Sequence, residues 1–181
     1  MSKLFWRLAL SFLGAVAALL CSGAEGAEIR NVWIDTDLSI GSSWREVDDA
    51  YALLLAVHSP EVRVVGISTT YGNAPLRAAT QRTRDLVNWL GLTIPINPGT
   101  ASTGELGHST EAADALASTL RENKRLTYIA LGPLTNLASF LTLHPLEAKR
   151  FDQIIMVAGK SPAPRFDSVR RRSFASTTPT S

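Results

Sequence analysis

Hydrophobic and polar positions follow two alternating periods along the middle of the chain. Short apolar runs of strand length occupy residues 32–36, 62–69, 94–96, 126–131 and 154–158. Between them, apolar residues recur at helical spacing around residues 48–58, 76–90, 113–120 and 134–143. Strands that alternate with helices in this way predict right-handed crossovers. The expected fold is therefore α/β, with an open, mainly parallel sheet and helices on both faces.

The first residues carry a different pattern. Lys3 and Arg7 precede an apolar run at residues 8–20, and the small residues Ser22, Gly23 and Ala24 follow. This order is typical of a secretory signal peptide, and the run is short for a membrane span. We expect residues 1–24 to be removed, a secreted or periplasmic location, and no stable membrane insertion after cleavage. An uncleaved anchor and a lipidated cysteine at position 21 are the alternatives.

Composition divides the remainder into a domain and a tail. Residues 25–159 hold the α/β pattern, and residues 160–181 have no apolar periodicity, which predicts a disordered tail. Residues 25–159 contain 11 Lys and Arg against 15 Asp and Glu, a net charge of −4. Nucleic-acid binding would need a basic stripe on the domain, so we expect no nucleic-acid partner.

Four carboxylates lie close together in the sequence. Asp35 and Asp37 end the first strand, and Asp48 and Asp49 open the first helix. Ligands of open α/β sheets bind at the carboxyl ends of the strands. Carboxylates gathered there repel one another unless they protonate, separate or hold a cation, and a hard divalent cation prefers oxygen ligands. Helix capping would explain Asp48 and Asp49, but not the pair that ends the strand.

Two segments carry a family resemblance. The residues IDTD at 34–37 and VDDAYALLLA at 47–56 resemble the amino-terminal signature of the inosine-uridine-preferring nucleoside hydrolases. That signature is an apolar strand, D-x-D-P-G-x-D-D-A and a leucine-rich helix. Here the ten residues 38–47 replace its short Pro-Gly link. The order of the carboxylates matches, whereas the geometry between the two halves of the motif does not follow from the sequence.

Two later positions extend the resemblance. Asn73 ends a T-x-x-G-N segment, lies 24 residues after Asp49, and matches an asparagine that contacts ribose in the family. The residues GPLTN at 132–136 match a second family segment, whose preceding backbone carbonyl is a metal ligand, so the ligand position here is Leu131. Thr135 and Asn136 are expected to satisfy free backbone groups where this strand gives way to a helix.

The resemblance implies a Rossmann-like core that hydrolyses the N-glycosidic bond of ribonucleosides to ribose and free base, with Ca²⁺ as cofactor. By family role Asp37 is the catalytic base and, with Asp49 and the Leu131 carbonyl, a metal ligand. Asp48 and Asn73 would hold the sugar hydroxyls. A homo-oligomer is also an expectation from the family.

Two other interpretations stay open. The resemblance covers about residues 31–159, and the family's N-x-x-x-E-F-N run and late His-Asp pair do not occur in this sequence. A truncated or frame-shifted, catalytically inactive half-domain is therefore one alternative. The other is a haloacid-dehalogenase-like phosphotransferase with Asp35 as nucleophile, which would leave Asn73 and GPLTN unexplained. In the hydrolase interpretation, Asp35 supports the metal ligands from the second shell.

Overall fold

A computed structural model describes residues 28–41, 47–123 and 125–158 of the chain. The expected signal peptide and tail, residues 1–24 and 160–181, lie outside them. Five strands form one sheet in the order β3-β2-β1-β4-β5, and every neighbouring pair is parallel. The open parallel α/β sheet predicted from the sequence is confirmed. The strands are β1 (Arg30–Thr36), β2 (Val62–Thr69), β3 (Ile96–Pro98), β4 (Leu126–Ala130) and β5 (Phe151–Met156).

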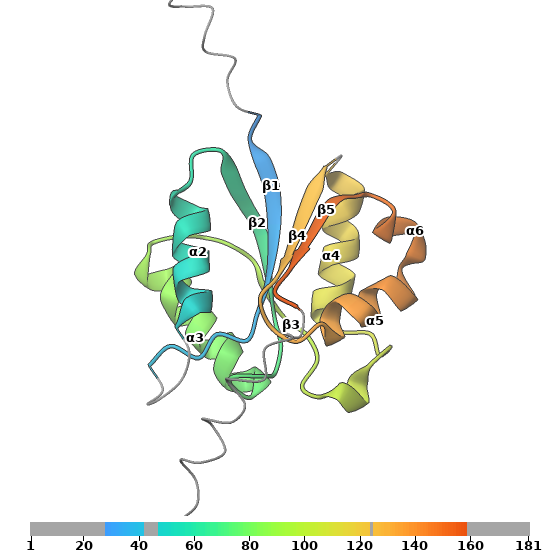
Figure 1. The fold of residues 1–181 in the computed structure, drawn as a ribbon, viewed down its shortest axis with the longest axis horizontal. Helices are drawn as coiled ribbons and strands as arrows, with labels where there is room; N and C mark the ends of the chain where they lie inside the picture. Colours follow the sequence, from blue (N-terminus) through green and yellow to red (C-terminus); the bar gives the residue numbers. More distant parts are fainter. Residues whose placement is uncertain (1–27, 42–46, 124, 159–181) are drawn as a thin grey trace, which may run out of the picture.

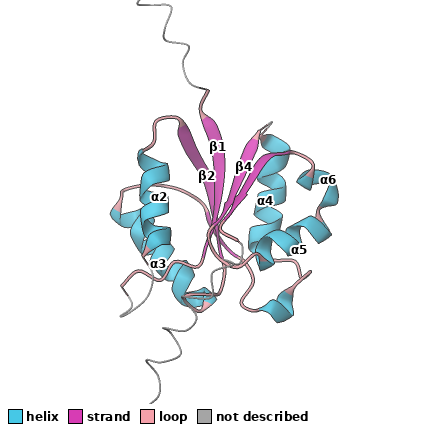
Figure 2. Cartoon of the chain, in the orientation of Figure 1, coloured by secondary structure: helices cyan, strands magenta, loops and turns pink. Residues whose placement is uncertain are grey.

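Helices cover the two faces of the sheet, which runs between them in Figures 1 and 2. One face carries α2 (Asp48–His58) and α3 (Leu76–Trp89). The other carries α4 (Glu111–Glu122), α5 (Thr135–Leu143) and the short α6 (Pro145–Ala148). A 3-10 turn, η1 (Thr103–Glu105), precedes α4. Within the described residues, none of the helices is long and apolar enough to cross a membrane.

The central strand β1 is buried on both faces, as its apolar sequence predicts. Val32 and Ile34 join the core beneath α2 and α3, whereas Trp33 joins the core beneath α4 and α5. The Trp33 ring packs directly over the backbone of β2, where a Cβ atom at Gly66 would lie 2.3 Å from the ring. Glycine at this position therefore allows the largest side chain of the core to fit against the sheet.

The direction of winding reverses beside β1. The chain proceeds outward from β1 through α2 to β2, and through α3 to β3. It then returns by way of α4 to place β4 on the opposite side of β1. In doubly wound sheets, ligands bind at such a reversal, outside the carboxyl ends of the strands. A ligand site is therefore expected at the carboxyl ends of β1 and β4.

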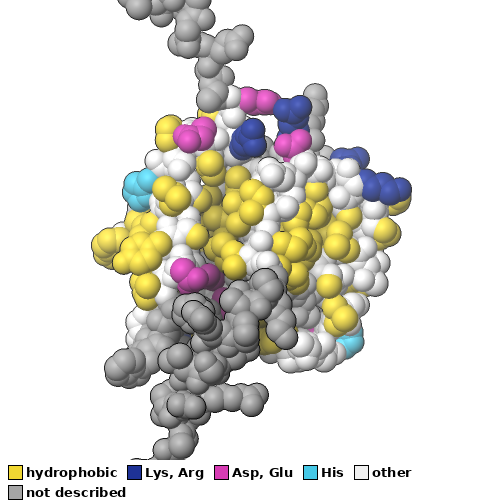
Figure 3. Space-filling model, in the orientation of Figure 1, with side chains coloured by type: hydrophobic (Ala, Val, Ile, Leu, Met, Phe, Trp, Pro, Cys, Tyr) yellow, Lys and Arg dark blue, Asp and Glu magenta, His cyan; other side chains and the backbone are white. Residues whose placement is uncertain are grey.

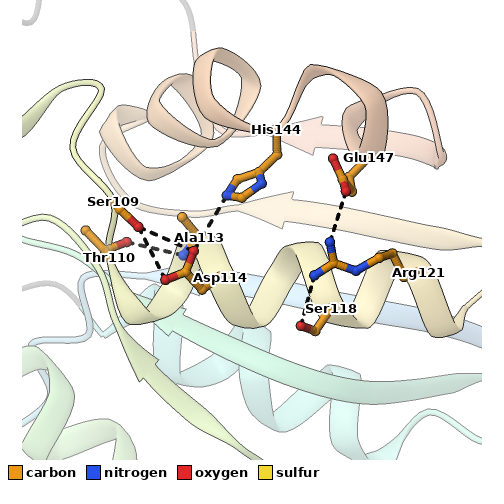
Figure 4. Close-up of polar contacts among 8 residues, drawn as sticks. All are labelled: Ser109, Thr110, Ala113, Asp114, Ser118, Arg121, His144 and Glu147. Atoms are coloured by element: carbon orange, nitrogen blue, oxygen red, sulfur yellow. Dashed lines mark hydrogen bonds and ion pairs between the residues drawn. The ribbon is translucent and has the colours of Figure 1, made fainter.

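Polar contacts fix α4 against the helices that follow it (Figure 4). The Thr110 hydroxyl accepts a hydrogen bond from the Ala113 backbone N–H at 3.2 Å, which caps the helix as its type and position predict. Arg121 pairs with Glu147 of α6 at 3.0 Å. Both side chains are partly exposed, so this pair orients α6 more than it stabilises the fold.

Two strands are shifted at both ends from their predicted bounds. The third was expected at residues 94–96, but β3 begins at Ile96: before it, Ile94 packs against the core and the Pro95 carbonyl accepts a hydrogen bond from the Ile67 N–H at 2.9 Å, outside the regular pairing. The fifth was expected at 154–158, but β5 begins at Phe151. As an edge strand it carries exposed polar residues, including Asp152, which interrupt the apolar run. The short elements η1 and α6 are below the length at which periodicity is informative.

One side of the sheet remains apolar at the surface. Figure 3 shows hydrophobic side chains gathered on the face where β4 and β5 lie between α2 and α5. Ile155, Met156 and Val157 at the end of β5 are 44%, 44% and 71% exposed. Ile129, paired with Ile155 across the two strands, is only partly buried. Among the described elements, none covers this part of the sheet.

Candidate functional site

The two halves of the aspartate motif meet at the end of β1. The Thr36 hydroxyl donates a hydrogen bond to Oδ2 of Asp49, and the Asp37 backbone N–H donates to the same oxygen at 3.2 Å. Asp49 lies in the first turn of α2, so these bonds attach the start of that helix to the strand end. The link through residues 38–47 therefore leaves Asp37 and Asp49 adjacent, a geometry that the sequence did not establish.

The Asp37 carboxylate has one engaged and one unengaged oxygen. Oδ2 accepts a hydrogen bond from the Asn73 backbone N–H at 2.5 Å. Oδ1 is buried and has no hydrogen-bond partner among the described residues. An unsatisfied buried carboxylate oxygen is costly, and a bound water or cation is one explanation for it. The backbone of Asn73 is thus held beside the Asp37 carboxylate.

Two glycines allow the loops after β2 and β4 to approach Asp37. Gly72 has a φ of +151°, and a Cβ atom there would lie 1.9 Å from Asp37 Oδ2. A Cβ atom at Gly132 would lie 3.1 Å from the Asp37 backbone nitrogen. The Leu131 N–H donates to the Asp35 carbonyl at 2.8 Å, which holds the segment after β4 beside β1. Leu131 therefore lies at the same edge of the sheet as Asp37.

Asp35 is fully buried behind this edge. Its Oδ1 accepts hydrogen bonds from the Ser68 hydroxyl at 2.6 Å and from the Asn136 amide at 2.8 Å. Burial raises the pKa of Asp35 to about 6, although these two hydrogen bonds oppose the shift. Such a carboxyl group is poorly placed to attack a substrate. This disfavours the phosphotransferase interpretation and agrees with a supporting role.

Asp49 is also perturbed by its surroundings. Burial raises its pKa to about 6, the hydrogen bond from Thr36 lowers it, and the neighbouring charge of Asp37 raises it further. Two carboxylates held this close would gain from a cation between them, since a cation removes the repulsion that otherwise favours protonation. The electrostatics of the site therefore match a metal-binding role for Asp37 and Asp49.

Asp48 occupies a different environment from the other three carboxylates. It is exposed in the first turn of α2, whereas Asp35, Asp37 and Asp49 are buried. Within the described part of the chain, no three His, Cys, Asp or Glu side chains are grouped as a metal site on their own. The unengaged Asp37 oxygen and the all-oxygen donor set fit a hard cation, but the Leu131 carbonyl and water would have to complete the shell.

Several residues of this edge were not singled out from the sequence. Thr36 was not predicted as a site residue, although its position at the end of β1, between Asp35 and Asp37, indicates that it lies in the site. The close approach of Gly72 and Gly132 to Asp37 has no signal beyond the glycines themselves. Asn136 was expected to bond backbone groups, which it does, but its bond to Asp35 spans 101 residues and was not foreseen.

Comparisons with known proteins identify the family to which the chain is similar. Residues 32–164 match the family described as inosine-uridine preferring nucleoside hydrolase. The chain is 31% identical over 159 residues to a probable uridine nucleosidase 2 of Arabidopsis thaliana, covering 72% of this chain and 47% of that protein. It is 30% identical to the pyrimidine-specific ribonucleoside hydrolase RihA of Salmonella typhimurium, covering 62% and 45%.

A solved structure shows the same fold. The plant nucleoside hydrolase PpNRh1 superposes with a TM-score of 0.63 at 32% sequence identity, covering 73% of this chain and 48% of that one. An inosine-guanosine nucleoside hydrolase gives a TM-score of 0.62. The chain spans about half the length of the curated relatives it matches.

Proposed function

The chain belongs to the inosine-uridine preferring nucleoside hydrolase family, and on that premise we propose that its site serves hydrolysis of the N-glycosidic bond of ribonucleosides, releasing ribose and free base. One observation carries the proposal. Asp37, Asp49 and the segments bearing Asn73 and Leu131 converge at the point where the sheet reverses its winding.

We assign the cofactor as Ca²⁺, held by Asp37, Asp49 and the carbonyl of Leu131. The support is the oxygen-only donor set and the buried, unengaged Oδ1 of Asp37. When bound, the ion would lower the pKa of a water molecule and orient the sugar diol. Calcium commonly takes about six to eight oxygen ligands, so substrate hydroxyls and water would supply the remainder.

Asp37 is assigned as the base. Its Oδ2 is fixed by the N–H of Asn73, which orients the carboxylate. Oδ1 has two lone pairs, so it could face the ion with one and accept a proton from the attacking water with the other. Thr36 holds the Asp49 carboxylate in a single orientation beside it. The strand end is thus a rigid support for the group that must move a proton.

Asp48 and Asn73 are assigned to the ribose hydroxyls. Asp48 is exposed at the start of α2, where a carboxylate can accept hydrogen bonds from a diol. These contacts would strengthen as the ribosyl carbon gains oxocarbenium character, which is a general source of catalysis in glycoside hydrolysis. The ribonucleoside is therefore the substrate partner that we propose.

The described residues supply only part of such a site. They offer two assigned carboxylate ligands and one carbonyl, and we assign none of them to protonating the departing base. A missing general acid typically costs about a hundred- to ten-thousand-fold in rate. With the described residues alone we therefore expect slow turnover, and an inactive domain that only binds nucleoside is the second candidate.

The test is release of base from inosine and uridine by protein purified from a host that lacks its own hydrolases. We expect release that depends on calcium and is abolished in Asp37→Asn, at a rate at least about a hundredfold below that of the Arabidopsis relative. Binding without release would favour the inactive candidate. Release that Asp37→Asn leaves unchanged would exclude the assignment.

A further inference from the structure

The side chain of Asn136 makes hydrogen bonds in all of its available directions. Oδ1 accepts from the backbone N–H and from the hydroxyl of Thr100, at 2.7 and 2.9 Å. Nδ2 donates to Oδ1 of Asp35 at 2.8 Å and to the Thr69 carbonyl at 3.2 Å. A backbone N–H can only donate and a carbonyl can only accept, so these partners also fix which way the amide points.

The partners of Asn136 come from three different strand ends. Asp35 is near the end of β1, Thr69 is the last residue of β2, and Thr100 lies just after β3. Asn136 itself is in the first turn of α5, directly after β4. One buried amide therefore ties together the carboxyl ends of the strands on which the proposed site is built.

Three of the assigned groups, those of Asp37, Asn73 and Leu131, lie a short distance from one of these bonds. Asp37 is two residues beyond Asp35, and Asn73 is four residues beyond Thr69. The N–H of Leu131 is bonded to the backbone carbonyl of Asp35. A displacement of the strand ends would therefore change the spacing between the Asp37 carboxylate, the Leu131 carbonyl and Asn73.

The Asn136 amide packs directly against the backbone at Gly99. A Cβ atom at Gly99 would lie 2.2 Å from Oδ1 and 2.3 Å from Nδ2 of Asn136. The Gly99 N–H donates to the Thr69 carbonyl at 2.9 Å, the same oxygen that Asn136 binds. Backbone and amide are thus in direct contact, and a shift of either one is transmitted to the other.

We propose that Asn136 is a positioning residue: it touches neither metal nor substrate, but it sets the separation of Asp37, Leu131 and Asn73. This inference rests on the proposed function. A merely structural role predicts only that the fold loses stability when the amide is removed. The positioning role predicts in addition that the site is distorted in a protein that is still folded.

Ser139 provides the matched control. It lies on the same helix, is 1% exposed, and its hydroxyl accepts a hydrogen bond from the Gly107 N–H at 2.9 Å, well along the chain from the assigned residues. Ser139→Ala and Asn136→Ala both remove a buried polar anchor of α5. Asn136→Ala removes four hydrogen bonds and Ser139→Ala removes one, so a purely structural role predicts a larger loss of stability in Asn136→Ala but no separate loss of calcium affinity in the folded variants.

The first readout is the calcium dissociation constant, measured by titration calorimetry at a temperature where both variants are folded by circular dichroism. We expect affinity at least tenfold weaker in Asn136→Ala and within twofold of wild type in Ser139→Ala. Folded Asn136→Ala with unchanged affinity, or with the loss that Ser139→Ala shows, would overturn the inference. If Asn136→Ala does not fold, Gly99→Ala is the replacement, because it displaces the amide without removing it.

The second readout needs neither metal nor turnover. The Asn73 N–H is bonded to Asp37, so its hydrogen exchange reports the spacing of the loops. We expect exchange at this amide to quicken at least tenfold in Asn136→Ala and not in Ser139→Ala. If wild type binds no calcium, the metal assignment fails while this measurement still decides the role of Asn136. Equal exchange in both variants would contradict it.

Discussion

The backbone N–H of Asp37 donates a hydrogen bond to Oδ2 of Asp49 across 3.2 Å, although ten residues separate the two halves of their motif. The bond joins the end of β1 to the start of α2, and the Thr36 hydroxyl reinforces it. The carboxylates of Asp37 and Asp49 are therefore adjacent, and Oδ1 of Asp37 has no hydrogen-bond partner among the described residues.

Calcium should stabilise the folded protein. A ligand that binds only the native state raises the free energy of unfolding by about 2.7 kcal/mol when it is present at a hundred times its Kd. For a chain of this size that corresponds to a rise in Tm of roughly 5 to 10 °C. Differential scanning fluorimetry with millimolar calcium should show the shift in wild type but not in Asp37→Asn or Asp49→Asn. An unshifted wild type would remove calcium from the account.

Acid should stabilise the calcium-free protein. Asp35 and Asp49 have pKa values of about 6 in the folded state against 3.8 for the free side chain, so the folded state binds more protons between these values. Stability is then greatest at low pH and is lost as the pH rises through about 6. Between pH 7 and pH 5 we expect a gain of about 1 to 3 kcal/mol in the free energy of unfolding.

Urea unfolding at a series of pH values in a chelator would measure this gain. Asp35→Asn should reduce the dependence on pH by about half, because one of the two perturbed groups is gone. A protein that becomes less stable from pH 7 to pH 5 would show that neither carboxyl group has the raised pKa.

Gly72→Ala should damage the site directly. The added Cβ atom would lie 1.9 Å from Asp37 Oδ2, and the backbone there has a φ of +151°. Strain of this kind typically costs about 1 to 3 kcal/mol. We expect a lower Tm and loss of the calcium shift. Gly104→Ala is the control, since its Cβ would lie 3.5 Å from the nearest side chain, and equal effects in the two variants would contradict the close approach.

We also propose that the chain is exported. The basic residues, apolar run and small residues before position 25 occur in the order of a cleaved signal. Mass spectrometry of protein from a periplasmic or secreted fraction should give an amino terminus near Glu25. An intact Met1 on protein from the soluble cytoplasmic fraction would contradict export.

The fold was largely predictable because its main elements carry strong periodicity. The apolar run of β1 and the helical spacing of α4 can be seen in the local sequence, and so can Gly91, which follows α3. The start of the edge strand β5 was misplaced because the exposed polar residues Asp152 and Gln153 separate Phe151 from the apolar run that begins at Ile154. An edge strand loses the apolar pattern that marks a buried one.

Only those site residues that belong to a family motif could be predicted from the sequence. Asp37, Asp49, Asn73 and Leu131 were assigned by family resemblance, and the structure places them at one edge of the sheet. The contact between Asn136 and Asp35 depends on which strands become neighbours. Local sequence does not contain that information.

The most direct test of the account is calcium-dependent binding of a ribonucleoside, because it requires Asp37, Asp48, Asn73 and the metal together. Inosine should be titrated calorimetrically into the 181-residue chain with millimolar calcium, with chelator, and into Asp37→Asn. We predict that inosine binds only in the titration of wild type with calcium. We also predict at least tenfold weaker binding of 2′-deoxyinosine, which lacks one hydroxyl of the diol. Inosine binding that persists in chelator or in Asp37→Asn, or no binding by wild type at millimolar inosine and calcium, would contradict the account.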